Sequence, residues 1–479
     1  YLYLYTKKNS QIKVFIFHVI LKNILNILFE KIPRFLFRKF KNIFTIKKKI
    51  NNNNKKFNND DMYLMYSPHG NSFKYSNSFK KNFIYNNEPS SKIYFKKIIT
   101  VWFEDKILKE TKRYLDINNL HYTFYSRRPT SELFSFFFIL KIFLIFMSTF
   151  IKSETSQNIV KKYLILKTII NIINARKFLK NYKNLKYIYA YYDSVFSRPF
   201  LYAANSLGIK TISHQERSSS YIWSIPLIYD HYFLNGKGFK DLYISTGSKI
   251  DNYHTYGVIR SGLIAPKKNS KFSNIMKNLK QNKKIILCAF IYLKPCDEEY
   301  LSLYGCDGFS KETNITFLNS IISLSKKFED CYFLISSKDI DQEFIIKKNY
   351  PEINLSDLKS KNINFLNNFK TNSYEASFYA DLVIGKQTNL MEEVLASKRK
   401  VLFFDSENHI STMNYPLNND KIIVKNFPEL KNFIENYLYK NQNYFDTKIS
   451  DLINNYLNES NNITGYKTFL KLLESVLKN

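Results

Sequence analysis

The sequence contains few of the residues that turn or cross-link a chain. Its 479 residues include 11 glycines, 11 prolines and 4 cysteines. The cysteines form no CxxC pair, and no His-x-His cluster accompanies them; they are Cys288, Cys296, Cys306 and Cys331. A chain this long and this poor in cysteine does not resemble a disulfide framework. We therefore expect free thiols in a reducing cytoplasm.

Acidic residues are also scarce relative to basic ones. The chain has 72 Lys and Arg against 40 Asp and Glu, which gives a formal net charge of +32. A field of this sign attracts nucleic acid, anionic lipid or phosphorylated substrates, and charge does not choose among them. The sequence shows no RNP motif and no zinc-finger spacing, so we predict no nucleic-acid partner. Since 45% of residues are hydrophobic, a folded core is expected, and the length predicts two or three domains of roughly 150 residues.

Residues 1–95 form a basic N-terminal region. Apolar residues within 13–45 follow helical spacing, which fits a core helix or a basic helix lying on a membrane. Residues 46–61 read "IKKKINNNNKKFNNDD" and predict an exposed low-complexity loop. The chain begins with Tyr1 rather than Met, which leaves open whether residues precede it.

An apolar run occupies residues 134–151, "FSFFFILKIFLIFMSTFI". Lys141 interrupts it, and about 20 apolar residues are normally needed to span a bilayer. A buried core helix, an interfacial helix and a membrane span all remain open, the first two being favoured over the third. Its basic flanks favour contact with anionic headgroups over full insertion.

Residues 96–105 predict a strand followed by a turn, and from about residue 160 strands alternate regularly with helices, which predicts a parallel α/β sheet in each half. The first half, 96–265, includes a strand ending in Asp193 and a helix stopped by Gly208. We expect 252–264 to turn into a short strand, and 266–284 to be a basic, loop-like linker. The second half is 283–425, and 426–479 is expected to form C-terminal helices.

One stretch of the second half, "YADLVIGKQTNLMEEVLASKRKVLFFD", places polar residues directly after an apolar strand. Ligands of parallel α/β sheets bind beyond the carboxyl ends of the strands. The residues expected at that edge are Gly385, Lys386, Gln387, Thr388 and Asn389. A helix start carries unpaired N–H groups and a positive dipole end, which suit a phosphate.

The helix that follows carries two adjacent carboxylates. We expect Asn389 to cap it, with Glu392 three residues later in a capping box. Glu393 could then accept hydrogen bonds from sugar hydroxyls such as those of a ribose. The competing interpretation is that Glu392 caps, Glu393 is solvated and the loop only turns the chain.

The stretch from Ala380 to Asp405 resembles the donor-site motif of GT-B glycosyltransferases, especially those of bacterial surface polysaccharides. Those enzymes carry an "aD.vi" strand, a Ser/Thr-rich loop and an "EEAL..GkPvl" helix and strand. Here Lys398 and Lys400 replace the usual Gly and Pro. The resemblance implies that Glu393 contacts the nucleotide ribose and that the loop around Thr388 and Asn389 lies by the diphosphate.

The first half supports the same resemblance over Ser206 to Leu263, which is similar to a "QHG" segment followed by "aD.y.v.G" and "G..r.d". Its His-Gly pair is Glu216-Arg217 here, a departure that leaves the role of that loop open. The implied fold is GT-B-like, with two Rossmann-like parallel-sheet domains facing a cleft. The implied activity is transfer of a sugar from a nucleotide-sugar donor to a glycan acceptor, lipid-linked at the inner leaflet. We expect the transfer to invert the sugar configuration, because it would use a single general base.

Such a reaction needs two kinds of residue. The charge of the leaving diphosphate must be stabilised, and Lys294 and Lys338, which each follow a predicted strand, join the loop residues as donor-binding candidates. The acceptor hydroxyl needs a general base. The candidates are Glu216, then His214 and Asp193. The competing interpretations are surface lysines, a structural histidine for His214 and a helix N-cap for Asp193.

No Asp-x-Asp follows a strand as expected for a metal-dependent enzyme, so we predict no metal and no cofactor beyond the donor substrate. The predicted location is cytoplasmic, peripheral on the inner face of the cell membrane. Two enzyme classes share this frame: CDP-glycerol-type polyolphosphate transferases and non-hydrolysing sugar-nucleotide epimerases. A non-catalytic nucleotide-binding or scaffold protein is the third alternative.

Overall fold

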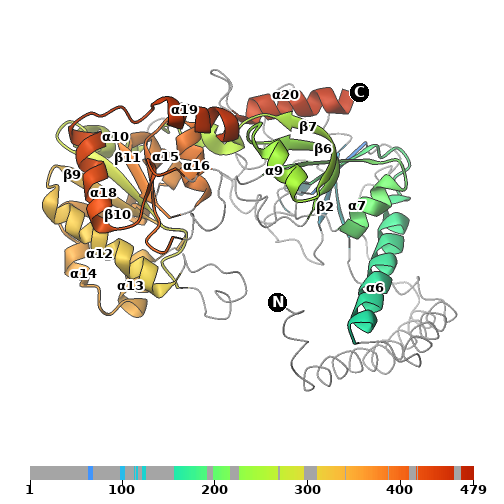
Figure 1. Ribbon diagram of the computed structural model, residues 1–479, viewed down its shortest axis with the longest axis horizontal. Helices are drawn as coiled ribbons and strands as arrows, with labels where there is room; N and C mark the ends of the chain where they lie inside the picture. The colour runs from blue at the N-terminus through green and yellow to red at the C-terminus, as the bar shows by residue number, and fades with distance from the viewer. Residues whose placement is uncertain are drawn as a thin grey trace.

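The computed structural model describes most of the chain beyond residue 155 and shorter pieces before it (Figure 1). The described residues are 63–67, 98–102, 113, 115–116, 121–125, 156–190, 198–215, 226–267, 270–295, 310–339, 341–369, 371–386, 388–408, 417, 419–457 and 465–478. The predicted helix within 13–45, the loop 46–61 and the apolar run 134–151 lie outside these residues.

The first domain is built on a parallel sheet of seven strands in the order β3-β2-β1-β4-β5-β6-β7. Every neighbouring pair is parallel. The chain therefore winds outward from β1 in one direction and from β4 in the other, as Rossmann-like domains do. The strands are β1 (Leu64–Ser67), β2 (Ile98–Trp102), β3 (His121–Phe124), β4 (Tyr187–Ala190), β5 (Lys210–His214), β6 (Ile228–Leu234) and β7 (Lys249–Thr255).

The predicted start of this domain at residue 96 is too late. Strand β1 lies before that boundary, is fully buried and pairs with both β2 and β4 at the centre of the sheet. It is a four-residue strand between basic, asparagine-rich segments, so sequence periodicity gave it too short a pattern to be recognised.

Helices of the first domain come from both ends of the described chain. They are α6 (Ser156–Leu179), α7 (Arg198–Asn205), α9 (Phe239–Ser245), the 3-10 helix η7 (Ile259–Leu263) and α20 (Gly465–Lys478). Gly208 follows α7 with φ +72°, in agreement with its predicted role as a stop. The C-terminal helix α20 returns to this sheet, where Phe469 is fully buried and the Tyr187 hydroxyl donates to the Val476 carbonyl at 3.0 Å.

The second domain contains a parallel sheet of six strands in the order β10-β9-β8-β11-β12-β13. This is the same doubly wound order as in the first domain, counted from β8. The strands are β8 (Lys284–Ala289), β9 (Cys331–Ser336), β10 (Ile363–Phe365), β11 (Leu382–Gly385), β12 (Val401–Phe404) and β13 (Ile423–Val424). The predicted α/β class with two Rossmann-like domains is thus confirmed.

Helices lie on both faces of the second sheet, with α12, α13 and α14 on one side and α15 and α16 on the other (Figure 1). The helices are α10 (Lys271–Leu279), α12 (Lys311–Lys327), α13 (Gln342–Asn349), α14 (Leu355–Leu358), η9 (Leu366–Phe369), α15 (Ser373–Tyr379), α16 (Asn389–Ala396), α18 (Phe427–Ile434), η10 (Glu435–Tyr439), α19 (Thr447–Leu452) and η11 (Ile453–Leu457). Here η9 is a 3-10 helix, whereas η10 and η11 are π-helical turns.

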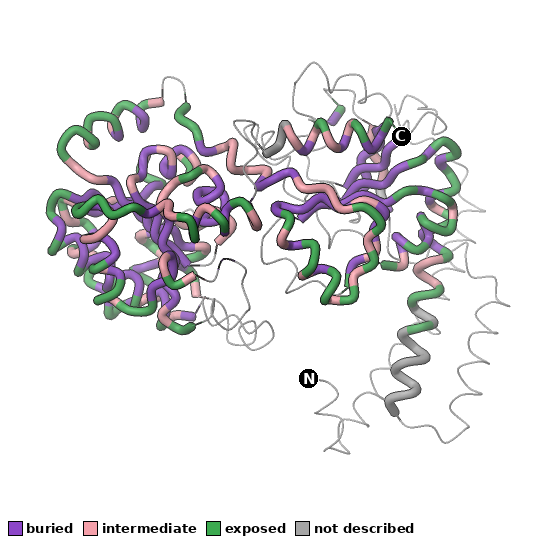
Figure 2. The backbone as a smooth tube through the Cα atoms, turned by 45° about the horizontal axis from the view of Figure 1, so that its top comes forward, coloured by how far each residue is buried: buried purple, intermediate pink, exposed green. Residues whose placement is uncertain are grey.

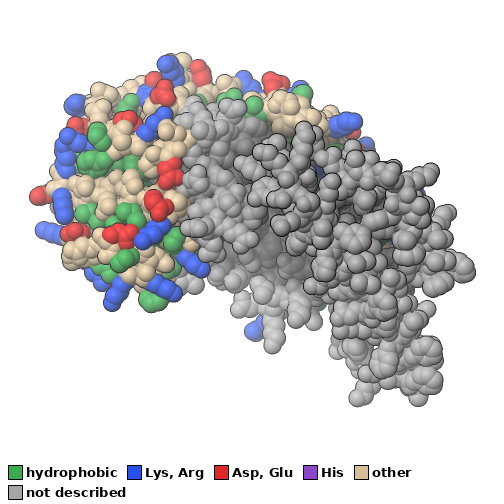
Figure 3. All heavy atoms as spheres, turned by 60° about the horizontal axis from the view of Figure 1, so that its bottom comes forward, with side chains coloured by type: hydrophobic (Ala, Val, Ile, Leu, Met, Phe, Trp, Pro, Cys, Tyr) green, Lys and Arg blue, Asp and Glu red, His purple; other side chains and the backbone are tan. Residues whose placement is uncertain are grey.

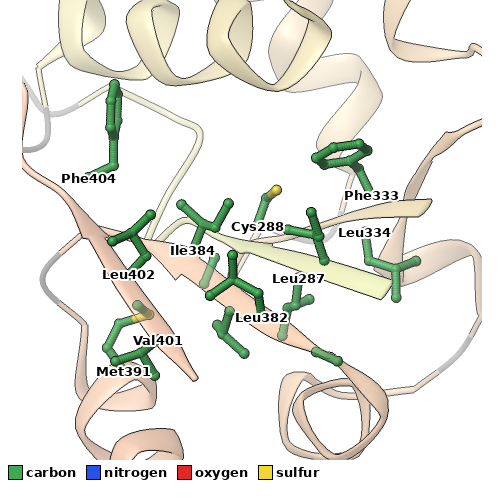
Figure 4. Close-up of a cluster of buried hydrophobic side chains, with 14 of the residues drawn as sticks. Leu287, Cys288, Phe333, Leu334, Leu382, Ile384, Met391, Val401, Leu402 and Phe404 are labelled. Carbon is green, nitrogen blue, oxygen red and sulfur yellow. The ribbon is translucent and has the colours of Figure 1, made fainter. Parts of the chain in front are cut away.

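Buried residues concentrate in the strands at the centre of each domain (Figure 2). Strands β8 and β9 are nearly continuous apolar runs, as expected for parallel strands covered on both faces. Figure 4 shows Ile384 of β11 and Leu402 of β12 among apolar side chains of β8 and β9. Cys288 and Cys331 are buried free thiols in this core, and burial raises the pKa of Cys331 to about 11.

Two predictions about the linker region are wrong. Residues 271–279 form helix α10 rather than a loop: Ser270 caps it by accepting from the Ser273 N–H, and Phe272 and Met276, four residues apart, are buried. The surrounding lysines hid this spacing. Residues 259–263 form η7 rather than a strand, because Gly257 with φ +91° turns the chain after β7.

The surface carries much of the basic charge. On the visible face of the second domain, Lys and Arg side chains are interspersed with Asp and Glu (Figure 3). The first domain exposes an apolar stripe on α6, where Ile165, Ile169 and Ile173 are 56%, 46% and 37% exposed at a spacing of four residues. None of the described helices combines the length and apolar content that crossing a bilayer requires.

Candidate functional site

The centre of the second sheet is a topological switch point. From β8 the chain continues through α12 to β9, and from β11 it continues through α16 to β12 on the opposite side. The two connections leave β8 and β11 in opposite directions, and the carboxyl ends of such strands are where doubly wound domains bind ligands. Lys386 follows β11 at this point, and Tyr292 and Leu293 follow β8.

Lys386 is a buried lysine, with only 7% of its surface exposed. Its Nζ donates to the Oδ1 of Asn314 at 3.0 Å. Burial lowers the pKa of Lys386 to about 7, and the nearby Glu407 carboxylate acts in the opposite direction. A buried group that titrates near neutrality is a common mark of a functional site.

Asn314 lies in the first turn of α12, and hydrogen bonds hold its side chain in one orientation. Its side chain is 2% exposed, and its Nδ2 donates to the Tyr350 hydroxyl at 2.9 Å and to the Tyr292 carbonyl at 3.3 Å. The Tyr350 hydroxyl in turn donates to the Leu293 carbonyl. Because the amide nitrogen is engaged on that side, the amide oxygen faces Lys386.

The start of α16 differs by one residue from the prediction. Thr388, not Asn389, is the N-cap, and its hydroxyl oxygen accepts from the Leu390 N–H at 3.1 Å. The predicted capping box is therefore wrong, because Glu392 then lies one position too late for it. Thr388 retains a hydroxyl proton that it can donate at the edge of the sheet.

Gly385 ends β11 at a point of close approach. A Cβ there would lie 2.9 Å from both the Ala289 carbonyl oxygen and the Met391 sulfur. The missing side chain thus lets α16 pack against β8 and β11 immediately below Lys386. Gln387 lies outside the described residues.

Glu393 is buried rather than solvated, with 4% of its side chain exposed. Its Oε1 lies 3.6 Å from the Nη1 of Arg260, which belongs to η7. One turn later, the Ser397 hydroxyl donates to the Ser261 carbonyl at 3.1 Å. Helix α16 therefore joins the loop after β11 to the segment that follows the last strand of the first domain.

Lys294 and Lys338 are both exposed beyond the ends of β8 and β9. The Lys338 Nζ lies 5.3 Å from the centre of the Tyr292 ring. The two strand ends are tied together by Asp339, whose Oδ2 accepts from the Leu293 N–H at 2.5 Å. The structure thus brings Lys294 and Lys338 to the same edge as Lys386, but at the surface.

His214 lies inside the first domain, with 1% of its surface exposed. Its Nδ1 is 2.7 Å from the Tyr189 hydroxyl, and the Phe469 ring of α20 lies 5.6 Å from its ring centre. In this arrangement the imidazole is a packed structural group, the competing interpretation offered above. Glu216 and Asp193 lie outside the described residues, so their roles as base stay predictions.

Three residues at the site were missed from the sequence: Asn314, Tyr350 and Arg260. An asparagine in the first turn of a helix that follows a buried strand was the available clue for Asn314. Nothing in the sequence pairs Arg260 with Glu393. Among the described residues, no group of three or more His, Cys, Asp or Glu side chains is placed to hold a metal ion.

No protein-family model matches this chain, and no curated protein matches it significantly. Solved structures similar to it include HepE of Anabaena in complex with UDP, at 10% identity and TM-score 0.48, covering 87% of this chain and 100% of that one. UDP-GlcNAc 2-epimerase from Neisseria meningitidis, bound to UDP-GlcNAc, matches at 12% identity and TM-score 0.43 over 87% and 100%. The wall teichoic acid polymerase TagF matches at 11% and 0.43 over 88% and 91%. Since these TM-scores are below 0.5, the site rests on the geometry of this chain.

Proposed function

We propose that this chain is a glycosyltransferase that moves a sugar from a nucleotide-sugar donor to a glycan acceptor in cell-surface polysaccharide synthesis. The observation that carries the proposal is Lys386: a cation held 7% exposed at the carboxyl end of β11, beside the switch point of the second sheet. The motif resemblance of 380–405 supports the same assignment.

The buried cation suits a diphosphate for an electrostatic reason. Burial disfavours the charged form of Lys386, and an anionic phosphate beside its Nζ would favour that form. The Thr388 hydroxyl and the first N–H groups of α16 add donors at the same edge. In this proposal, these groups stabilise the negative charge of the diphosphate, and a divalent metal is not needed for that role.

The remaining roles extend this assignment. Glu393 accepts hydrogen bonds from the ribose, and Lys294 and Lys338 contribute positive charge at the mouth of the site. Glu216, with Asp193 as the other candidate, supplies the base that activates the acceptor hydroxyl. The acceptor is lipid-linked, and the net charge of +32 favours a position at an anionic inner leaflet.

Isothermal titration with UDP, CDP, GDP and CMP tests the proposal. We expect UDP or GDP to bind the wild-type chain, and Lys386→Met to weaken that binding at least about tenfold, as loss of a charged hydrogen-bonding partner does. Lys348→Met, which removes an exposed lysine of α13, is the matched control and should leave binding unchanged.

Two other results would point elsewhere. Binding of CDP alone would favour the polyolphosphate transferase, and binding of no nucleotide would favour a scaffold that kept the fold. If Lys386→Met and Lys348→Met bound the nucleotide equally well, the assignment of Lys386 to the diphosphate would be wrong.

A further inference from the structure

The ion pair between Arg260 and Glu393 joins the two domains at the proposed donor site. Arg260 follows the last strand of the first domain, whereas Glu393 lies on the helix that begins at Thr388. Their side chains are 15% and 4% exposed, and Nη1 lies 3.6 Å from Oε1. Two charges this deeply buried attract one another strongly, because little water screens them.

The backbone around Arg260 is fixed rather than free. Val258 and Ile264, on either side of η7, are 5% and 9% exposed and belong to the core of the second domain. The Ser397 hydroxyl of α16 donates to the Ser261 carbonyl, next to Arg260. The packing of Val258 and Ile264 therefore places the Arg260 guanidinium against α16, as a positioning residue requires.

The chemistry of the Glu393 carboxylate limits which ligand groups it can bind. A carboxylate accepts hydrogen bonds and donates none, so the ligand group beside Glu393 must be a donor. A phosphate is excluded there by its charge, whereas a pair of vicinal hydroxyls fits the two carboxylate oxygens. Arg260 approaches Oε1 of that carboxylate, and the attraction between the two charges favours one orientation of the group.

We infer that Arg260 is a positioning residue of the donor site, which holds the Glu393 carboxylate in the orientation that receives the ribose 2′- and 3′-hydroxyls. The inference rests on the proposed function, since it needs a nucleotide in the site. Under this inference, Arg260, which lies outside the second domain's sheet, determines the preference for ribose over deoxyribose. The donor site is then incomplete unless η7 is seated on α16.

Paired titrations test this role. UDP, CDP and GDP are each compared with their 2′-deoxy forms on the full chain, and the base that binds tightest is carried forward. We expect the wild-type chain to bind the ribonucleotide about tenfold more tightly, as one hydrogen bond to a charged group provides. Arg260→Met should bring the ratio close to one, with little change in the affinity for the deoxynucleotide. Arg260→Lys should recover part of the ratio.

The controls separate positioning from loss of structure. Ser397→Ala removes the neighbouring contact between α16 and η7 without removing a charge, and it should keep the ribose preference. If Arg260→Met kept the wild-type ratio, or weakened both nucleotides equally, the inference would be overturned. Absence of any nucleotide binding to the wild-type chain would instead overturn the proposed function, and this inference with it.

Discussion

The Nζ of Lys386 and the Oδ1 of Asn314 lie 3.0 Å apart, although 72 positions separate them in the chain. The first follows β11 and the second lies in the first turn of the helix after β8. Their contact therefore exists only because β8 and β11 are neighbours at the centre of the second sheet. This contact places the Lys386 side chain at the switch point of the sheet, between β8 and β11.

Donor affinity should depend on pH through Lys386. Its pKa of about 7 means that the free site loses its proton as pH rises through neutrality, whereas a bound diphosphate favours the charged form. We expect affinity for UDP-glucose, which does not titrate in this range, to be constant below about pH 6.5 and to fall up to about tenfold per pH unit above 7. Isothermal titration in buffers of different ionisation enthalpy should show proton uptake on binding. An unchanged affinity from pH 6 to 9 would contradict this prediction.

Folding stability should change in the opposite sense. The pKa of Lys386 is lowered from 10.5 to about 7 in the folded chain, so between these values the unfolded chain binds more protons. Stability attributable to this residue therefore rises with pH over that window, by about 1 kcal/mol per pH unit. Urea denaturation at pH 7, 8 and 9 would measure it. In Lys386→Met the increment should vanish, since the variant has no proton to lose; parallel pH profiles for the two proteins would count against the burial of the charge.

Gly236 should be needed for the joint between the C-terminal region and the first domain. A Cβ at Gly236 would clash with the Asn455 carbonyl oxygen, and the Gly238 N–H donates to that same oxygen at 2.9 Å. We expect Gly236→Ala to destabilise the chain by about 1–3 kcal/mol, as overpacking does, and to increase hydrogen exchange in η11. Lys237→Ala, at the exposed position between the two glycines, is the matched control. Equal exchange in the two variants would refute the close approach.

The apolar stripe on α6 should contribute to membrane contact, if the proposed acceptor is lipid-linked. Replacing Ile165, Ile169 and Ile173 with Gln removes exposed apolar surface from one helix face and leaves the buried face intact. We expect weaker flotation with anionic vesicles at both low and high salt, without a change in nucleotide binding. Phe344→Gln, at a position 58% exposed on the second domain, controls for general surface polarity. Identical flotation of all three proteins would exclude α6 from the contact.

Most of the fold was predicted from the alternation of long strands and helices in the sequence. Strands such as β8, β9 and β11 are apolar runs bounded by polar turns, and α12 has clear helical spacing, so local pattern sufficed for them. The short elements were missed for physical reasons: β1, β10 and β13 have two to four residues each, too few to show a period. Helix α10 was hidden because lysines lie within it and on both sides of it in the sequence.

The site was only partly predictable because its geometry depends on tertiary contacts. The sequence placed Lys386 at the end of a strand, but its burial follows from the helices that cover it. The motif identified Glu393. Its contact with Arg260 could not be predicted, because the two residues lie in different domains, far apart in the sequence. His214 shows the opposite error: a polar residue at a strand end was expected at the edge, and α20, from the far end of the chain, covers it.

The return of α20 to the first sheet bears on the order of events during synthesis. Tyr63, beside the earliest described strand, donates its hydroxyl proton to the carbonyl of Leu477, 414 positions later. The apolar face around Tyr189, Phe233 and His214 stays without its cover until the final helix has left the ribosome. The core of the first domain is therefore completed only after the second domain has been synthesised.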